Sequence, residues 1–336
     1  MPTHIANKSA DVVEVRRRSI LCLLVATAGT ALLPTLATAS TEAGNNLMPQ
    51  FWKAYDLAGA GDSTGNDRAQ ALLDGFFLPQ QELMSGAGVK VSLKQVAGWL
   101  KKFDPMADDV RALSATVPSA YARQLERFCA ALPDFDSAAA PVYFMPSLFQ
   151  FDGHLQPWKG VLPLFVGLDG IVYYHGAQAD LTVLLNHEMF HLYQGQKNPA
   201  MMLDPAPPIY VNLWMEGVAT YMSQLLTPGA TRLHVLLDDA HLAAAGPAMM
   251  RTIATDLLQH LDSNSDADME RFFSIGYHGD IPARGGYLIG LAIAERAGKN
   301  MTPAQMGALP ASEIRGIVME QLKAIAGGIS LFLRGP

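Results

Sequence analysis

Apolar residues change their spacing twice along this chain, and the order of the changes limits the possible folds. Helical spacing follows the capping residue Ser92 through Phe103, and a second helix is predicted from Pro118 to Leu132. Between 141 and 175 the pattern changes to short aromatic and β-branched stretches separated by Gly, Pro and Asp: PVYFMPSLFQF, GVLPLFVGL and GIVYYH. Helical spacing returns from Asp180. This order predicts an α+β fold, mainly helical with a small mixed sheet, rather than a doubly wound sheet.

The first 39 residues have the composition of an export signal. Three arginines, Arg16 to Arg18, precede an apolar run from Ser19 to Leu33, and Ala37-Thr38-Ala39 is a small-x-small cleavage site. A membrane anchor is the alternative, but the run is shorter than the roughly 20 apolar residues that span a bilayer. We therefore expect cleavage after Ala39 and a periplasmic or secreted protein. The arginine pair resembles a twin-arginine signal, although Arg16 stands where Ser or Thr is usual, so the export route stays open.

Charge and cysteine content exclude several classes of protein. The chain has 24 basic and 31 acidic residues. Its first 39 residues contain four of the bases and two of the acids, so the remainder has a net charge of −9. We expect no nucleic-acid partner and, after signal cleavage, no attraction to anionic membranes. Cys22 would leave with the signal, and Cys129 alone cannot form an intramolecular disulfide.

The helix predicted from Asp180 to Gly195 contains the sequence His-Glu-Met-Phe-His. His187 and His191 are four residues apart, so both imidazoles project from one side of the helix and can bind one ion. Glu188 then lies beside the ion and can take a proton from water, which is the arrangement of a metallopeptidase helix. Alternatively, the two histidines are core residues that bond to the backbone. A catalytic zinc usually has three protein ligands, so a third is needed.

A second helix, predicted to begin at Asn212 and stop at Pro228-Gly229, supplies the candidate third ligand. Glu216 lies on this helix next to Gly217, which permits close packing between helices. A proline-rich loop, 197–211, joins the two helices and would let them run antiparallel. Asp204 is the other nearby acid, but in that loop nothing fixes its direction.

These residues resemble the gluzincin metallopeptidases, in which an HExxH helix is followed by a helix with a Trp-x-x-Glu-Gly-x-Ala-x-Tyr pattern. Residues 214–221 keep Glu-Gly-x-Ala-x-Tyr and lack one residue between Trp214 and Glu216. The closest likeness is to poorly characterised bacterial predicted zinc-dependent proteases. It covers about 40 residues and none of the N-terminal helices.

The resemblance implies that His187, His191 and Glu216 bind Zn²⁺ and that Glu188 is the general base. It also implies an oxyanion donor from a later segment; in Gly276–Gly290, Tyr287 is the first candidate and His278 the second. Many gluzincins have an acid four residues after the ligand glutamate, which orients a histidine ligand. This chain has Thr220 there, whose hydroxyl would hold an imidazole less strongly.

Two other motifs are weaker evidence for a function, because each lacks a feature that the function requires. The sequence GDSTG places Ser63 in a serine-hydrolase string, but no strand is predicted before it, as a nucleophile elbow requires. The acids from Asp262 imitate a calcium loop in which Ala267 replaces the glycine and Phe273 replaces the bidentate acid.

The sequence therefore predicts an exported zinc-dependent metallohydrolase, a peptidase acting on peptide or protein substrates. Its regions are a signal peptide (1–39), an N-terminal helical region (40–140) and a zincin-like catalytic domain (141–336), the last with strands in 141–175, metal-binding helices in 180–227 and C-terminal helices. The rivals are an inactive zinc-binding protein on a gluzincin scaffold and a serine hydrolase using Ser63. The substrate, the oligomeric state and the role of the N-terminal helices stay open.

Overall fold

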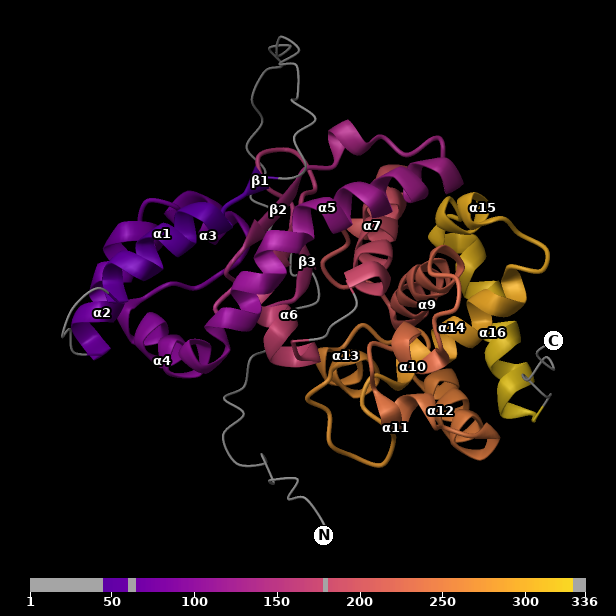
Figure 1. The fold of residues 1–336 in the computed structure, drawn as a ribbon. Helices are drawn as coiled ribbons and strands as arrows, with labels where there is room; N and C mark the ends of the chain where they lie inside the picture. Colours follow the sequence, from indigo (N-terminus) through magenta and orange to yellow (C-terminus); the bar gives the residue numbers. More distant parts are fainter. Residues whose placement is uncertain (1–44, 60–64, 178–180, 329–336) are drawn as a thin grey trace, which may run out of the picture.

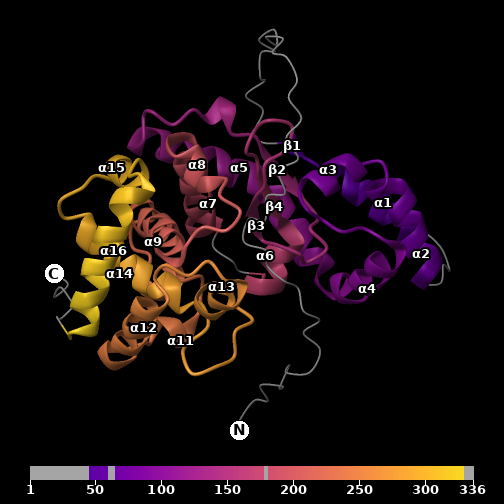
Figure 2. The ribbon, with the colours of Figure 1, turned by 180° about the vertical axis from the view of Figure 1, so that it is seen from behind.

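A computed structural model describes residues 45–59, 65–177 and 181–328 (Figure 1). The predicted signal peptide, the Asp180 cap and Ser63 lie outside the described residues. The predicted fold class is confirmed, because the structure is mainly helical with one small mixed sheet and an N-terminal helical region. The sheet lies between the N-terminal helices on one side and the C-terminal helices on the other (Figures 1 and 2).

The sheet has four strands in the order β1-β2-β4-β3. They are β1 (Asn45–Asn46), β2 (Val142–Met145), β3 (Gly153–Leu155) and β4 (Leu164–Gly167). Strands β1, β2 and β4 are parallel, whereas β3 pairs antiparallel with β4, with His154 opposite Phe165. Every residue of β4 is buried, as expected for a strand covered on both faces. Strand β3 is an edge strand of the sheet and contacts the C-terminal half through the helix at 181–197.

The N-terminal helices pack around a cluster of aromatic rings. They are α1 (Met48–Gly59), α2 (Gly65–Leu72), η1 (Leu73–Phe77), α3 (Gln81–Gly86), α4 (Leu93–Phe103), η2 (Asp104–Met106) and α5 (Ala107–Ala131). Phe51 contacts Trp99 and Phe103 at ring-centroid distances of 6.0 and 5.6 Å. The Ser92 cap is confirmed, since its side chain accepts a hydrogen bond from the Gln95 backbone N–H.

The predicted start of a helix at Pro118 is wrong, because this proline lies inside the long helix α5. A proline inside a helix removes one backbone hydrogen bond. Buried residues continue along the same face before and after it, including Val110, Val117, Tyr121 and Phe128. Tertiary packing therefore holds the helix together through the proline.

The stretch GIVYYH is also not a strand, because it belongs to helix α6 (Leu168–His175). Short apolar runs fit a buried helix as well as a strand. Here Asp169, in the first turn, is completely buried, and its carboxylate accepts hydrogen bonds from the backbone N–H groups of Ser147 and Phe149 and from the Trp99 indole. These bonds join the start of α6 to the loop after β2 and to α4.

The C-terminal half begins with α7 (Leu181–Lys197), α8 (Pro199–Met202) and α9 (Ile209–Leu226). Helix α7 continues past Gly195, the predicted stop, where the missing side chain leaves room for Leu162. Helix α9 begins three residues before Asn212, the predicted cap. The Asn212 side chain instead donates to the backbone oxygen of Pro207. The predicted stop before Pro228 is confirmed.

Helix α9 is the central helix of this half and contacts α7, α14 and α16 (Figure 1). The remaining elements are η3 (Ser137–Ala139), α10 (Arg232–Val235), α11 (Ala240–Ala243), α12 (Pro247–Gln259), α13 (Asp266–Phe273), α14 (Gly285–Ala297), α15 (Pro303–Gly307) and α16 (Ala311–Ala326). Within the described ranges, no helix is both long and apolar enough to span a membrane.

Candidate metal centre

Three side chains from two helices converge on one point. The Nε2 atoms of His187 and His191 are 3.0 Å apart, and Glu216 Oε2 lies 3.1 Å from the first and 3.4 Å from the second. In a tetrahedral zinc site, bonds of roughly 2.0–2.1 Å separate neighbouring ligand atoms by about 3.3 Å. The three distances between the ligand atoms are close to this value, so the group can hold a metal ion. Asp204 does not join the group and instead accepts a hydrogen bond from the Ala206 N–H in its own loop.

The helices position these side chains through their spacing and packing. His187 and His191 lie on one side of α7 and are 7% and 8% exposed, and Glu216 faces them from the packed helix α9. Apolar side chains such as Leu184 and Met189 bury the rest of α7. The ligand atoms are therefore held by packed helices rather than by loops, which is how metal sites keep a fixed geometry.

Burial and mutual charge set the protonation of the three groups. Burial lowers the pKa of His187, and the neighbouring His191 lowers it further. Burial also acts to lower the pKa of His191, but the charge and hydrogen bond of Glu216 outweigh it and raise the pKa to about 9. Burial acts to raise the pKa of Glu216, yet His191 and His187 hold it well below its usual range. The lowered pKa of Glu216 favours the ionised carboxylate, which is the form that binds a metal.

Gln194 orients the second histidine. Its Oε1 lies 2.8 Å from His191 Nδ1, and its Nε2 donates to the Met215 carbonyl, which immediately precedes Glu216 in α9. A ring nitrogen held in this way leaves Nε2 directed at the metal position. Thr220 does not take this role, because its hydroxyl donates to the backbone oxygen of Glu216 at 2.7 Å. The sequence patterns did not identify Gln194, although its spacing of three residues from His191 places both on one face of the helix.

Glu188 lies where α7 meets the edge strand of the sheet. The residue is half-buried, and its side chain packs directly against Gly153, the first residue of β3. A Cβ atom at position 153 would lie 2.7 Å from the Glu188 carboxyl carbon. The strand therefore approaches the carboxylate as closely as only glycine permits.

Tyr287 lies beside the candidate ligands. Its ring stacks with the His187 imidazole, with centroids 6.1 Å apart and an angle of 28° between the planes. Gly217 of α9 and Gly290 of α14 touch, which brings the two helices together and places Tyr287 one turn before the contact. Gly217 thus permits the approach of α14. His278 is exposed in the preceding loop.

Arg284 is a further residue of this site that the sequence patterns did not identify. It precedes α14, is only 4% exposed, and places its guanidinium carbon 4.5 Å from the centre of the Tyr287 ring. Its positive charge is one of the smaller causes that lower the pKa of His187, after burial. Nothing in the local sequence distinguishes this arginine from a surface residue, so only the fold reveals it.

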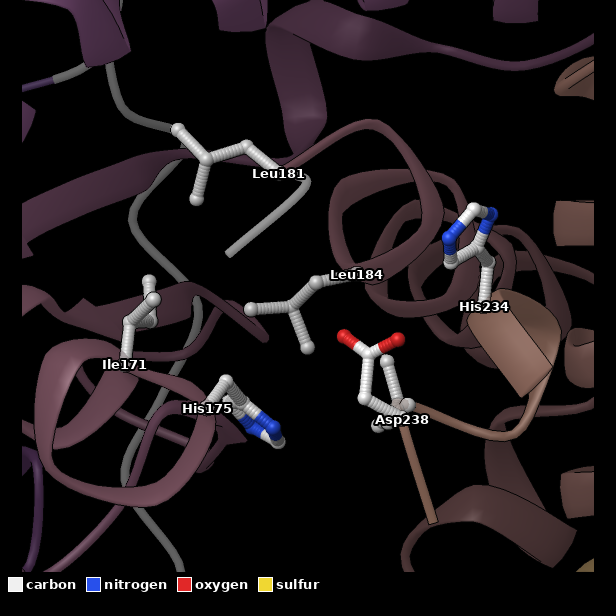
Figure 3. A pocket seen from close by; sticks show the side chains of 7 residues that line it. Ile171, His175, Leu181, Leu184, His234 and Asp238 are labelled. Carbon is white, nitrogen blue, oxygen red and sulfur yellow. The ribbon is translucent and has the colours of Figure 1, made fainter. Parts of the chain in front are cut away.

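A small pocket lies along α7 on the N-terminal side of the candidate ligands (Figure 3). Its lining residues are Ile171, His175, Leu181, Leu184, His234, Leu237 and Asp238. Leu184 is one helical turn before His187, but none of the three candidate ligands lines the pocket. The Asp238 carboxylate faces the pocket, and His175 is paired with Asp152 at 2.7 Å. The pocket therefore has apolar walls, and its polar lining side chains are one carboxylate and two imidazoles.

The calcium-like motif forms no metal group in the described part of the chain. Its acids have other partners: Asp262 pairs with Arg315 at 2.7 Å, and Asp268 accepts a hydrogen bond from the Ser265 hydroxyl.

Comparison of the chain with family models, with curated proteins and with solved structures finds no match. The gluzincin resemblance therefore depends on the motif residues and stays a prediction.

Proposed function

We propose that this protein is an exported zinc-dependent metallohydrolase that cleaves peptide bonds. The observation that carries the proposal is the convergence of His187, His191 and Glu216, whose ligand atoms lie 3.0–3.4 Å apart. Two imidazoles and one carboxylate are the ligand set of several catalytic zinc sites in peptidases. Bound there, zinc would act as a Lewis acid, lowering the pKa of water and polarising a carbonyl group.

The remaining residues would carry the proton and the developing charge. Glu188 directly follows a ligand histidine, so its carboxylate can accept a proton from the attacking water and return it to the leaving amine. Tyr287 lies beside His187, so its hydroxyl is the candidate donor to the oxyanion. Gln194 holds His191 in one orientation.

Substitution of Glu188 tests the proposal. We expect zinc-loaded Glu188→Gln to keep its zinc and its fold, and to hydrolyse a quenched-fluorescent peptide library about 10²–10⁴-fold more slowly, the usual contribution of a general base. Glu313→Gln, which changes an exposed glutamate of α16, is the matched control and should behave as wild type. Equal rates for wild type and Glu188→Gln would remove Glu188 from the mechanism. Zinc binding without hydrolysis by wild type would favour the inactive zinc-binding protein.

A chelator separates the proposed activity from that of a serine hydrolase. Removal of zinc should abolish peptide hydrolysis, and zinc should restore it. Activity that survives the chelator and is lost in Ser63→Ala would instead support the serine-hydrolase alternative.

The export part of the proposal depends on the sequence of residues 1–39. We expect the mature protein from its native host to begin at or near Ser40. N-terminal sequencing that finds Met1 or Pro2 would show that the signal is not cleaved.

A further inference from the structure

Arg284 is a buried cation without an anionic partner among the described residues. The residue is 4% exposed, and no carboxylate in the described part of the chain lies within ion-pair distance of its guanidinium. Nη1 donates to the Leu236 carbonyl at 3.2 Å, and Nε is buried without an acceptor. Buried charges in proteins are normally paired, since removing a charge from water is costly. An arginine left in this state is suited to bind an anion that enters from outside.

The backbone also holds Arg284 in an unusual conformation. Its φ is +58° and its ψ is +24°, the left-handed region that non-glycine residues rarely adopt. The surrounding structure maintains this conformation: the following helix α14 packs against α9 through Gly290. The preceding loop is held by Asp280, which accepts hydrogen bonds from Arg271 and Tyr277. Strained residues maintained by their surroundings are concentrated at functional sites.

The guanidinium contacts one residue next to the candidate metal centre and one next to the pocket. On one side it is 4.5 Å from the centre of the Tyr287 ring, which stacks on His187. On the other side it is bonded to Leu236, and the next two residues, Leu237 and Asp238, line the pocket (Figure 3). An anion bound by Arg284 would therefore lie within one or two side chains of the candidate ligands.

We propose that Arg284 binds a carboxylate group of the substrate beside the bond that is cleaved. This inference rests on the proposed peptidase function and specifies its substrate class. In a peptide, the carboxylate is either the C-terminal group or the side chain of an acidic residue, and a guanidinium binds both by the same charge-assisted hydrogen bonds. The alternative is that Arg284 has only a structural role and connects α14 to the turn at Leu236 through its hydrogen bond.

Matched peptides distinguish these possibilities. The reference is the best-cleaved sequence from the library, blocked at both ends and with Gln next to the cleaved bond. The second peptide has Glu in place of that Gln, and the third keeps Gln but ends in a free carboxylate just after the cleaved bond. We expect zinc-loaded wild type to prefer the second or the third over the reference in kcat/KM by roughly tenfold to a hundredfold, as expected for a hydrogen bond to a charged group. Whichever peptide is preferred identifies the source of the carboxylate.

Variants at position 284 assign the preference to this residue. Arg284→Gln should lose the preference, so that its kcat/KM values for the carboxylate peptides equal its value for the reference peptide, and Arg284→Lys should keep part of the preference. Arg296→Gln is the matched control on the same helix, since Arg296 bonds to Gln321 at the far end of α14. It should keep the full preference. Thermal unfolding of each variant shows whether the fold is retained.

Two kinetic results would overturn the inference. One is equal kcat/KM of wild type for all three peptides. The other is an Arg284→Gln variant, folded and zinc-loaded, that loses activity equally on all three peptides, as a purely structural role of Arg284 predicts.

Binding to metal-free protein keeps this test separate from that of the proposed function. Calorimetric titration of metal-free wild type with the three peptides should show tighter binding of a carboxylate peptide, and Arg284→Gln should abolish the difference. If no peptide is hydrolysed by the zinc-loaded protein, the proposed function fails, while this binding difference still decides the role of Arg284. Equal binding of all three peptides to wild type rejects it.

Discussion

Gly153 is the residue that allows the edge strand β3 to lie against Glu188. Glu188 atoms would lie 2.7–2.8 Å from a Cβ at this position, closer than side-chain carbons tolerate. The atoms in the way belong to the end of a flexible side chain, so the carboxylate would move while the backbone stays in place. The position of a single hydrogen-bonding group can thus depend on the absence of a methyl group on another element.

We predict that Gly153→Ala reduces kcat without loss of zinc or fold. A displacement of about 1 Å at a catalytic group can cost roughly 10²-fold in rate, so we expect a decrease of about 10- to 100-fold. Peptide hydrolysis, zinc content and thermal unfolding measure the three quantities. In a Glu188→Gln background the same substitution should have almost no further effect, because the group that it displaces is already inactive. An equal additional decrease in that background would show that Gly153 acts through something other than Glu188.

The sequence identified the groups closest to the candidate metal position but not those that support them. His187 and His191 project together because a four-residue helical spacing fixes where side chains point, and Glu216 meets them because α9 packs against α7. Gln194 shares a helix with its partner His191, so its role follows from spacing once the motif is accepted. Arg284 belongs to no recognisable motif and lies far after the ligand helices in the sequence, so only the fold brings it to the site.

At the scale of elements, the contact between α9 and α14 assembles the site. A Cβ on Gly217 would lie 2.3 Å from the Gly290 carbonyl oxygen, and a Cβ on Gly290 would lie 2.6 Å from the Leu213 oxygen. These neighbours are backbone atoms and cannot rotate away, so any side chain would push the helices apart. Because Glu216 is next to one glycine and Tyr287 is one turn from the other, this contact sets the distance between the candidate ligand and the candidate oxyanion donor.

We predict that Gly290→Ala destabilises the protein by about 1–3 kcal/mol, the usual cost of overpacking a close-packed core. It should also lower activity, because α14 moves Tyr287 away from His187. Gly316→Ala is the control: Gly316 lies within α16, and a Cβ added there would meet no atom within 4 Å, so alanine should stabilise by roughly 0.5–1 kcal/mol. Denaturant unfolding measures both changes. A Gly290→Ala variant as stable as wild type would show that the two helices can separate without cost.

Two predictions of secondary structure were wrong for physical reasons. GIVYYH is helical because Asp169, just before it, fixes the first turn of α6 by accepting hydrogen bonds from Ser147 and Trp99, both distant in sequence. Pro118 lies within α5 because the burial of residues before and after it in the helix outweighs the loss of one hydrogen bond. Both outcomes depend on long-range contacts, which local spacing does not contain.

At the scale of the whole molecule, the two helices of the candidate metal centre contact elements that are distant from them in sequence. Helix α7 also contacts α5 and strand β3, and α9 also contacts α14 and α16. An ion bound by ligands from both α7 and α9 would link the sheet side of the molecule to its C-terminal helices. Zinc binding should therefore stabilise the entire fold, because a ligand that binds only the folded state shifts the unfolding equilibrium.

We predict that zinc raises the Tm of the metal-free protein and that Glu216 is needed for most of the increase. At a free zinc concentration 100 times the Kd, the stabilisation is about 2.7 kcal/mol, which corresponds to several degrees in a protein of this size. Glu216→Ala should weaken zinc binding by at least the roughly 10- to 100-fold that follows removal of an outer partner of a ligand, so the same zinc concentration should give a much smaller shift. Asp204→Ala is the matched control, because Asp204 bonds within its own loop and should leave the shift unchanged. The reverse result, a shift lost in Asp204→Ala and retained in Glu216→Ala, would reject Glu216 as the third ligand while leaving the histidine pair as a metal site.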